Sequence, residues 1–206
     1  SDSKKGMFSP ARLKVNTITD QLKLERPASK VIAMSIKNRG AILPGGHLSD
    51  GTYWFDSKSG DFITSTFYKQ ELPQWVADFN KKNLPEKSMK QVWNTFFPIE
   101  RYVESGPDNS PYEHLLPGKT EPVFPYDLSK MSTKETAYDL FTCTPFANTF
   151  LTDFAIQALH AEKMGQNGAT DMLCISYSST DIIGHEFGPQ SKEIQDTYIR
   201  LDRELE

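Results

Sequence analysis

The chain contains 206 residues, of which 23 are Lys or Arg and 27 are Asp or Glu, so its formal net charge is −4. No basic block interleaved with aromatic residues occurs, which argues against a nucleic-acid duplex as the main partner. No run of about 18 apolar residues occurs either, so the sequence predicts no membrane-spanning helix. A hydrophobic share of 37% with 12% aromatic residues is enough for a packed core.

The first third of the chain predicts alternating helices and strands. Thr17 or Thr19 is suited to begin a helix that runs through residues 21–24. Residues 31–36 form a short, apolar and partly β-branched run, which is typical of a buried parallel strand. Residues 41–44 then predict a short helix or turn that ends at the following pair of glycines.

The next segments predict a hairpin, a helix and an irregular stretch. Residues 52–55 and 62–67 are aromatic and β-branched, and the turn-forming residues between them indicate a β-hairpin. Residues 72–79 have apolar side chains at helical spacing, with Pro73 tolerated in the first turn. From about residue 83 to residue 135, prolines recur among Gly, Ser and Asp, which predicts an irregular insertion.

The last third returns to regular structure. Pro145 precedes apolar residues at helical spacing, which predict a helix that ends near Gly165 or Gly168. Residues 171–177 predict a strand. Ser191 is a suitable N-cap for a final helix with Glu193 in its first turn, where the helix dipole favours an anion. The apolar residues that we expect to form the buried face of this helix are Ile194, Tyr198, Leu201 and Leu205.

The two cysteines say little about the compartment. Cys143 and Cys174 lie far apart in the sequence, so they permit one disulfide bond but do not imply one. Cys174 lies inside an apolar run, which favours a buried free thiol.

The pattern as a whole predicts the α/β fold class. Residues 1–68 and 142–206 are expected to form two parts of a core, and residues 69–141 a cap-like insertion between them. The chain begins without Met, and no Gly, Asn or Pro ends its last helix. We therefore expect an excised piece of a longer protein, which would expose apolar surface and self-associate when isolated.

Residues 178–189 place Asp181 and His185 four residues apart. Two glycines and a proline argue against a plain helix, so we expect a strand, a loop that bears Asp and His, and then a helix. Zinc accepts imidazole nitrogen and carboxylate oxygen, and open α/β sheets bind ligands in such loops. The plainer interpretation is that Asp181 caps a turn and that His185 is an ordinary loop residue. Of the other histidines, His47 is the least implausible third ligand; the rest are His114 and His160.

The resemblance to a known family becomes specific in this stretch. Residues 171–189 resemble the metal-binding segment of the type I phosphodiesterase/nucleotide pyrophosphatase branch of the alkaline phosphatase superfamily. In that family the matching Asp and His, with a Gly before the His and a Gly-Pro after it, bind one of two zinc ions. The resemblance therefore implies that Asp181 and His185 are metal ligands and that the cofactor is Zn²⁺.

A second candidate pair, Lys37 and Arg39, follows the first predicted strand. In an extended chain, residues two apart point the same way, so the pair can present two cations to one phosphate. Without other evidence, cations in this position face solvent. Residues 37–47 are, however, similar to the subgroup typified by PafA-like alkaline phosphatases, which are periplasmic phosphate monoesterases. There the matching Lys and Arg contact the transferred phosphoryl group.

This resemblance carries further expectations for the parent protein. It implies a periplasmic or secreted location, small-molecule phosphate esters as substrates, and part of an alkaline-phosphatase-like parallel sheet. Packing helices, the β-hairpin and a Pro-rich cap insertion would accompany that sheet.

The resemblance also implies groups that this sequence lacks. In the family a Thr or Ser attacks phosphorus, one zinc ion activates it, and the other stabilises the leaving oxygen. The nucleophile and one Asp ligand lie upstream of the matched region, and an Asp-His pair and a final His lie downstream. We therefore expect the chain alone to be inactive. Three hydroxyl residues could be considered as substitutes for the nucleophile, but they have no adjacent base and no family match: Thr142, Thr144 and Ser179.

Three functional hypotheses remain open at this point. The first is a metal-dependent phosphate monoester hydrolase. The second is a nucleotide pyrophosphatase/phosphodiesterase of the same branch, which would not be expected to carry the Lys-x-Arg pair. The third, from another class, is a non-catalytic binding or cap module whose aromatic residues contact a glycan or a partner. Its candidate contacts, which are more often core residues, are Tyr53, Trp54 and Trp75.

Overall fold

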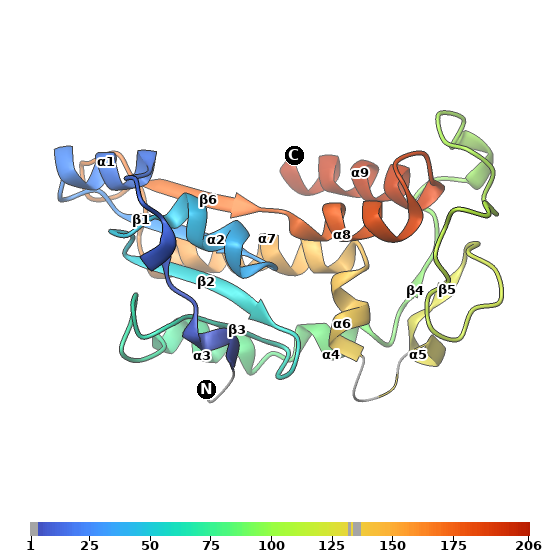
Figure 1. The fold of residues 1–206 in the computed structure, drawn as a ribbon, viewed down its shortest axis with the longest axis horizontal. Helices are drawn as coiled ribbons and strands as arrows, with labels where there is room; N and C mark the ends of the chain where they lie inside the picture. Colours follow the sequence, from blue (N-terminus) through green and yellow to red (C-terminus); the bar gives the residue numbers. More distant parts are fainter. Residues whose placement is uncertain (1–3, 132, 134–136) are drawn as a thin grey trace. The chain divides into compact units, whose positions relative to one another are not determined.

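The computed structural model describes residues 4–131, 133 and 137–206. Within them the chain forms two compact units. The first unit contains residues up to 83 and residues 151–177, and the second contains residues 84–150 and 178–206. Figure 1 shows the elements of both units in sequence colours. The fold class is α/β, as expected.

The first unit is built on a four-stranded sheet with the order β3-β2-β1-β6 (Figure 1). β1 (Val31–Ser35) pairs in parallel with β2 (Gly51–Asp56) and with β6 (Met172–Ser176). β3 (Asp61–Ile63) pairs with β2 in antiparallel fashion. The predicted strands and the hairpin are therefore confirmed, although β3 ends at Ile63 and is shorter than expected.

The two faces of this sheet carry different helices. On β2, Trp54 packs with Ala41 and Ile42 of α2 (Asn38–Gly45), so α2 covers one face. The neighbouring Tyr53 points the opposite way, because side chains alternate along a strand, and its ring meets the ring of Phe154 at 5.6 Å. Phe154 belongs to α7 (Phe146–Ala161), whose residues from 151 onward cover this second face.

Aromatic side chains fill the space between β2, β3 and the second helix layer. Phe154 is fully buried and stacks on Phe62, with ring centroids 3.8 Å apart. α3 (Gln74–Asn80) adds Trp75 and Phe79 at 5.0 and 5.1 Å from the same ring. The helix predicted over residues 72–79 is thus confirmed.

A capping box begins the first α-helix of the chain. Short 3₁₀ turns, Lys4–Met7 and Pro10–Arg12, precede α1 (Ile18–Glu25). Thr17 is the N-cap of α1: its side chain accepts from the Asp20 backbone N–H, and the Asp20 carboxylate accepts from the Thr17 N–H. Of the two candidate helix starts in the sequence, the structure uses the first.

The second unit is helical, with a small two-stranded sheet. Its helices are α4 (Leu84–Ser88), α5 (Leu128–Met131), α6 (Ala137–Thr142), α8 (Ser178–Phe187) and α9 (Lys192–Leu205), together with residues 146–150 of α7. The 3₁₀ turn Ile99–Arg101 also lies here, and β4 (Val92–Trp93) pairs with β5 (Tyr126–Asp127). The Pro-rich stretch is therefore less irregular than predicted.

The interpretation of residues 178–189 as a loop is wrong, because α8 spans most of them. Gly184 does not break the helix: its φ is not positive, and a Cβ there would make only an ordinary contact of 3.6 Å with Ile194 Cδ1. Gly188, with a φ of +87°, follows the helix and takes the left-handed conformation that commonly ends one. Asp181 and His185 are therefore helical residues.

The predicted buried face of α9 is also wrong in part. Ile194 is buried, but Tyr198 is 58% and Leu205 67% exposed. The remaining buried positions are polar, namely Glu193, Asp196 and Thr197. Ser191 is the N-cap, as expected, and accepts from the Ile194 N–H.

None of the helices in the described part of the chain has the length and apolar character needed to cross a membrane.

Candidate functional site

The two predicted cations lie at the start of α2. Lys37 is its N-cap, with extended backbone angles, and Arg39 lies in its first turn. The expectation of an extended segment through both residues is therefore wrong, because the helix begins at Asn38. Lys37 is half-buried and Arg39 is exposed, and the first turn contains no acidic residue. Two cations and the positive end of a helix dipole thus share one short segment.

The start of α2 is held tightly against the carboxyl ends of two strands. A Cβ on Gly40 would lie 2.5 Å from Ser35 Oγ and 2.8 Å from Ser176 Oγ. Ser35 Oγ donates to the Ser176 carbonyl oxygen at 2.9 Å and accepts from the Lys37 N–H at 3.2 Å. A Cβ at position 40 would displace both serine hydroxyls, so glycine preserves this contact, and the Lys37 N–H is bonded to the last residue of β1.

The predicted metal ligands lie one turn apart on α8. His185 Nε2 is 3.4 Å from Asp181 Oδ1, and their side chains are 76% and 59% exposed. Residues at this spacing share one face of a helix. The pair therefore presents an imidazole and a carboxylate together on an accessible surface of the second unit.

These two donors fit a divalent zinc ion in chemistry but do not complete a ligand set. Zinc takes imidazole nitrogen and carboxylate oxygen, and protein sites usually supply three or four such ligands. Among residues 4–131, 133 and 137–206, no group of three His, Cys, Asp or Glu residues is placed to hold one metal ion. Asp181 and His185 would be part of such a site.

The other histidines have different surroundings. His47 Nδ1 lies 3.1 Å from Asp20 Oδ2, and its Nε2 lies 3.2 Å from the Leu13 carbonyl oxygen, so both ring nitrogens are engaged within the first unit. His114 Nδ1 lies 3.1 Å from a carboxylate oxygen of Glu186 in the second unit. His160 is exposed near the end of α7, as expected.

Of the three hydroxyl groups considered as nucleophiles, two form hydrogen bonds with nearby backbone carbonyl groups, and the third is buried. Thr142 Oγ1 donates to the Asp139 carbonyl oxygen at 2.7 Å, and Thr144 Oγ1 donates to the Phe141 carbonyl oxygen at 2.8 Å. Both are ordinary helix-end contacts. Ser179 Oγ is buried, with no hydrogen-bond partner in the described chain.

Sequence reasoning missed a group of buried carboxyls in the second unit. Glu193, predicted as an anion at a helix start, is fully buried, and burial raises its pKa to about 8. Glu113 is 9% exposed, and burial raises its pKa to about 7. Burial also raises the pKa of Asp108. A single sequence carries no local signal for this, because the residues that cover these groups come from distant segments.

Comparison with known proteins places the chain in a family. Residues 44–206 match the family described as type I phosphodiesterase / nucleotide pyrophosphatase. The chain belongs to this family. Asp181 and His185 lie inside the matched region, whereas Lys37 and Arg39 precede it.

Individual relatives align over nearly the whole chain. It is 49% identical over 207 aligned residues to the alkaline phosphatase PhoV of Synechococcus elongatus, covering 100% of this chain and 37% of the relative. It is also 49% identical to a Myroides odoratus protein named calcium-transporting ATPase, covering 99% of this chain and 38% of the relative.

The fold matches a solved structure of the same kind. The crystal structure of the wild-type alkaline phosphatase PafA superimposes with a TM-score of 0.93 at 44% identity, covering 100% of this chain and 40% of that chain. The sheet and its packing helices are therefore those of an alkaline-phosphatase-like fold. The chain spans about two fifths of the length of these proteins or less.

Proposed function

We propose that the protein containing this chain is a metal-dependent phosphate monoester hydrolase, an alkaline phosphatase. The observation that carries the proposal is the start of α2, where Lys37 and Arg39 lie in a turn without acidic residues. This segment precedes the family-wide match but lies inside the alignment with the alkaline phosphatase PhoV. A monoester carries two negative charges at neutral pH, and two cations at a helix start suit such a group.

Each candidate residue has a proposed role. Lys37 would act as a compact charge and Arg39 as a bidentate donor, both toward the transferred phosphoryl group. Asp181 and His185 would supply two ligands to one of two zinc ions. When bound, zinc supplies positive charge that stabilises developing negative charge on oxygen. The nucleophilic Thr or Ser of the proposed phosphoenzyme would lie outside this chain, as would the remaining ligands.

The nearest alternative is a nucleotide pyrophosphatase or phosphodiesterase, which the family match itself favours. A diester has one negative charge fewer at its phosphorus, so it gains less from two cations. The non-catalytic alternative loses its main support, because Tyr53 and Trp54 are fully buried and Trp75 is packed on Phe154.

The experiment compares a phosphate monoester with a phosphodiester as substrates of the full-length protein. We expect the monoester to be preferred, and Lys37→Ala or Arg39→Ala to lower kcat/KM for it by about a hundredfold. The same substitutions should lower diester hydrolysis far less. Lys58→Ala, at an exposed position in the β2–β3 turn of the same unit, is the matched control.

Two outcomes would reject the proposal. A preference for the diester that survives both substitutions would support the phosphodiesterase. No hydrolysis of either ester by folded, zinc-loaded protein would support a binding module.

The proposal also carries expectations for the isolated chain and for the parent protein. The 206-residue chain alone should be inactive and should self-associate. The parent protein should be exported to the periplasm or secreted.

A further inference from the structure

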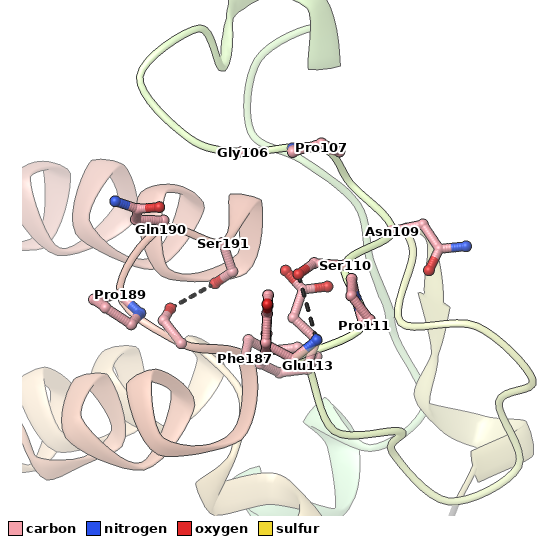
Figure 2. Close-up of a pocket in the computed structure, with 12 residues that line it drawn as sticks. Gly106, Pro107, Asn109, Ser110, Pro111, Glu113, Phe187, Pro189, Gln190 and Ser191 are labelled. Atoms are coloured by element: carbon pink, nitrogen blue, oxygen red, sulfur yellow. Dashed lines mark hydrogen bonds between the residues drawn. The ribbon is translucent and has the colours of Figure 1, made fainter.

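The second unit contains an open cavity of about 490 Å³ between two segments. Residues 106–113 form one wall, and residues 187–191, at the end of α8 and the start of α9, form the other (Figure 2). The volume lies in the range of small-molecule sites. Much of the lining is apolar, from Phe187, Tyr112 and three prolines, Pro107, Pro111 and Pro189.

The two walls are joined by backbone hydrogen bonds. The Gly106 N–H donates to the Gln190 carbonyl oxygen at 2.7 Å, and the His114 N–H donates to the Glu186 carbonyl oxygen at 2.8 Å. Ser105 Oγ adds a contact to Gln195 Oε1 at 2.6 Å. The cavity is therefore formed by the fold itself and does not depend on a bound molecule to bring its walls together.

One lining residue is a buried acid. Glu113 is 9% exposed, and its Oε2 atom has no hydrogen-bond donor in the described part of the chain. Figure 2 shows its carboxyl group near Ser110, between the two walls. A buried carboxylate oxygen without a partner is costly, and ligands or ordered water commonly supply the missing partner.

Two more carboxyls near Glu113 have the same deficit. Asp108 Oδ1 and Glu193 Oε2 are buried and lack donors among the described residues. The negative charge of Asp108 favours the neutral form of Glu113, and the charges of Glu113 and Asp108 favour the neutral form of Glu193. Glu193 has one donor, the Tyr126 hydroxyl at 2.6 Å from Oε1. The region therefore holds three acids and too few donors.

The nearby lysines are bonded to carbonyl groups. Lys119 Nζ donates to the carbonyl oxygens of Val123 and Pro125 at 2.6 and 3.1 Å. Lys192 Nζ donates to the Tyr102 carbonyl oxygen at 2.9 Å. Both lysines also interact electrostatically with Asp108 and favour its charged form. Glu113 has no lysine among its electrostatic partners in the described part of the chain, so a cationic ligand could supply the missing partner of its unbonded oxygen.

We propose that this cavity binds a small organic cation, an ammonium group on a short apolar body, with its charge toward Glu113. The prolines and Phe187 would pack against the apolar body. Tyr112, a lining residue that is largely exposed, would place its aromatic ring against the ammonium group. A metal ion is the weaker choice, because the lining is apolar and no three described acids or histidines are placed to hold one. The inference rests on the second unit alone and does not depend on the proposed phosphatase function.

The test measures binding of n-butylammonium chloride to the full-length protein by calorimetry, with 1-butanol and calcium chloride as separate probes. We expect butylammonium to bind more tightly than butanol, and Glu113→Gln to weaken it by about tenfold or more. Glu104→Gln, an exposed acid in the same unit, is the matched charge control and should bind as the wild type does.

Tyr112→Ala provides a variant that should fold normally, because this side chain is 89% exposed. This substitution should weaken the binding of butylammonium by about two- to fivefold. Equal affinities for butanol and butylammonium would overturn the proposal in favour of a purely apolar cavity. Calcium binding that depends on Glu113, without amine binding, would make it a metal site. No amine binding at millimolar concentrations would mean that water alone satisfies Glu113.

Discussion

Two carboxyl groups, one in each unit, are completely buried and are held in opposite ways. In the first unit, Asp20 accepts the backbone N–H groups of Thr17, His47 and Leu48, at 2.9, 2.7 and 2.9 Å. Its Oδ2 atom also lies 3.1 Å from His47 Nδ1. Burial by itself would raise the pKa of Asp20, but these hydrogen bonds together lower it to about 2.

Glu193 in the second unit shows the contrary case. Among the described residues, the Tyr126 hydroxyl is the one side-chain donor to its carboxyl, and burial raises the pKa of Glu193 to about 8. One turn later on the same helix, Asp196 is equally buried but is bonded by Trp93, Tyr102 and Arg200. Comparison of Asp20 with Glu193 shows that burial alone does not decide the direction of a pKa shift, because donors aimed at the carboxylate oppose the effect of burial.

The same contrast extends to the acid that lines the cavity. Asp20 ties the start of α1 to the loop after α2, which is a structural role in the first unit. In the second unit, Glu193 is fully buried and lies outside the cavity lining, whereas Glu113 lines the cavity with one oxygen unbonded, where a ligand can supply the missing partner.

The largest expected effect is in the core of the first unit. Phe154→Ala would leave a cavity beside Phe62 and Phe79, and should lower the free energy of unfolding by about 3–5 kcal/mol. Chemical denaturation measures this. The control is Phe67→Ala, because Phe67 is 48% exposed and should cost much less. Equal losses for the two variants would mean that this aromatic cluster does not stabilise the unit.

The next effect concerns the fully bonded acid. Asp20→Asn removes the charge and one acceptor, and should lower the free energy of unfolding at pH 7 by about 2–3 kcal/mol. The folded-state pKa lies below the unfolded value of 3.8, so this contribution is complete above pH 4 or so and disappears as pH falls toward 2. Denaturation from pH 7 to pH 2 should show the two proteins converging. Asp78→Asn removes an exposed ion pair with Lys81 and should cost far less than Asp20→Asn, because solvent screens such a pair. A loss there as large as that of Asp20→Asn would contradict the interpretation.

A smaller effect of opposite sign is expected for the poorly bonded acid. The folded-state pKa of Glu193 lies above the unfolded value of 4.5, so protonation favours the folded form and stability falls as pH rises toward 8. Glu193→Gln keeps an acceptor for Tyr126, and should raise the free energy of unfolding above pH 8 by about 1 kcal/mol. Thermal melting at pH 5.5 and 8.5 should show a flatter profile for the variant. If Glu193→Gln were less stable than the wild type at pH 8.5, the Glu193 carboxylate would have more hydrogen-bond donors than the structure gives it.

The sequence predicted the elements whose signals are local. The strand β1, the hairpin and the helix after Pro145 follow from runs or spacings of apolar residues within one segment. The structure differs where distant residues decide. Gly184 looks like a helix breaker in the sequence, but it lies inside α8, which packs against α9. β4 and β5 are two residues each and become strands only by pairing with each other.

The hypothesis for the site rests on local features too. The spacing of Asp181 and His185 and the resemblance of their segment predict metal donors, which stays a prediction, whereas the loop expected around them is wrong. The polar face of α9 was not predictable, because Asp196 is buried by Trp93 and Tyr102 from far along the chain. Glu113 gave no signal, since nothing in its own segment indicates that the end of α8 covers it.

We propose that the two units carry different parts of phosphate chemistry, with the phosphate-binding cations on α2 and the metal donors on α8. The most direct measurement is zinc content and monoester hydrolysis in full-length Lys37→Ala and His185→Ala proteins, with Lys58→Ala as control. We predict that Lys37→Ala keeps its zinc but loses about a hundredfold in kcat/KM, whereas His185→Ala loses both zinc and activity. Full zinc content and full activity in His185→Ala would contradict the claim.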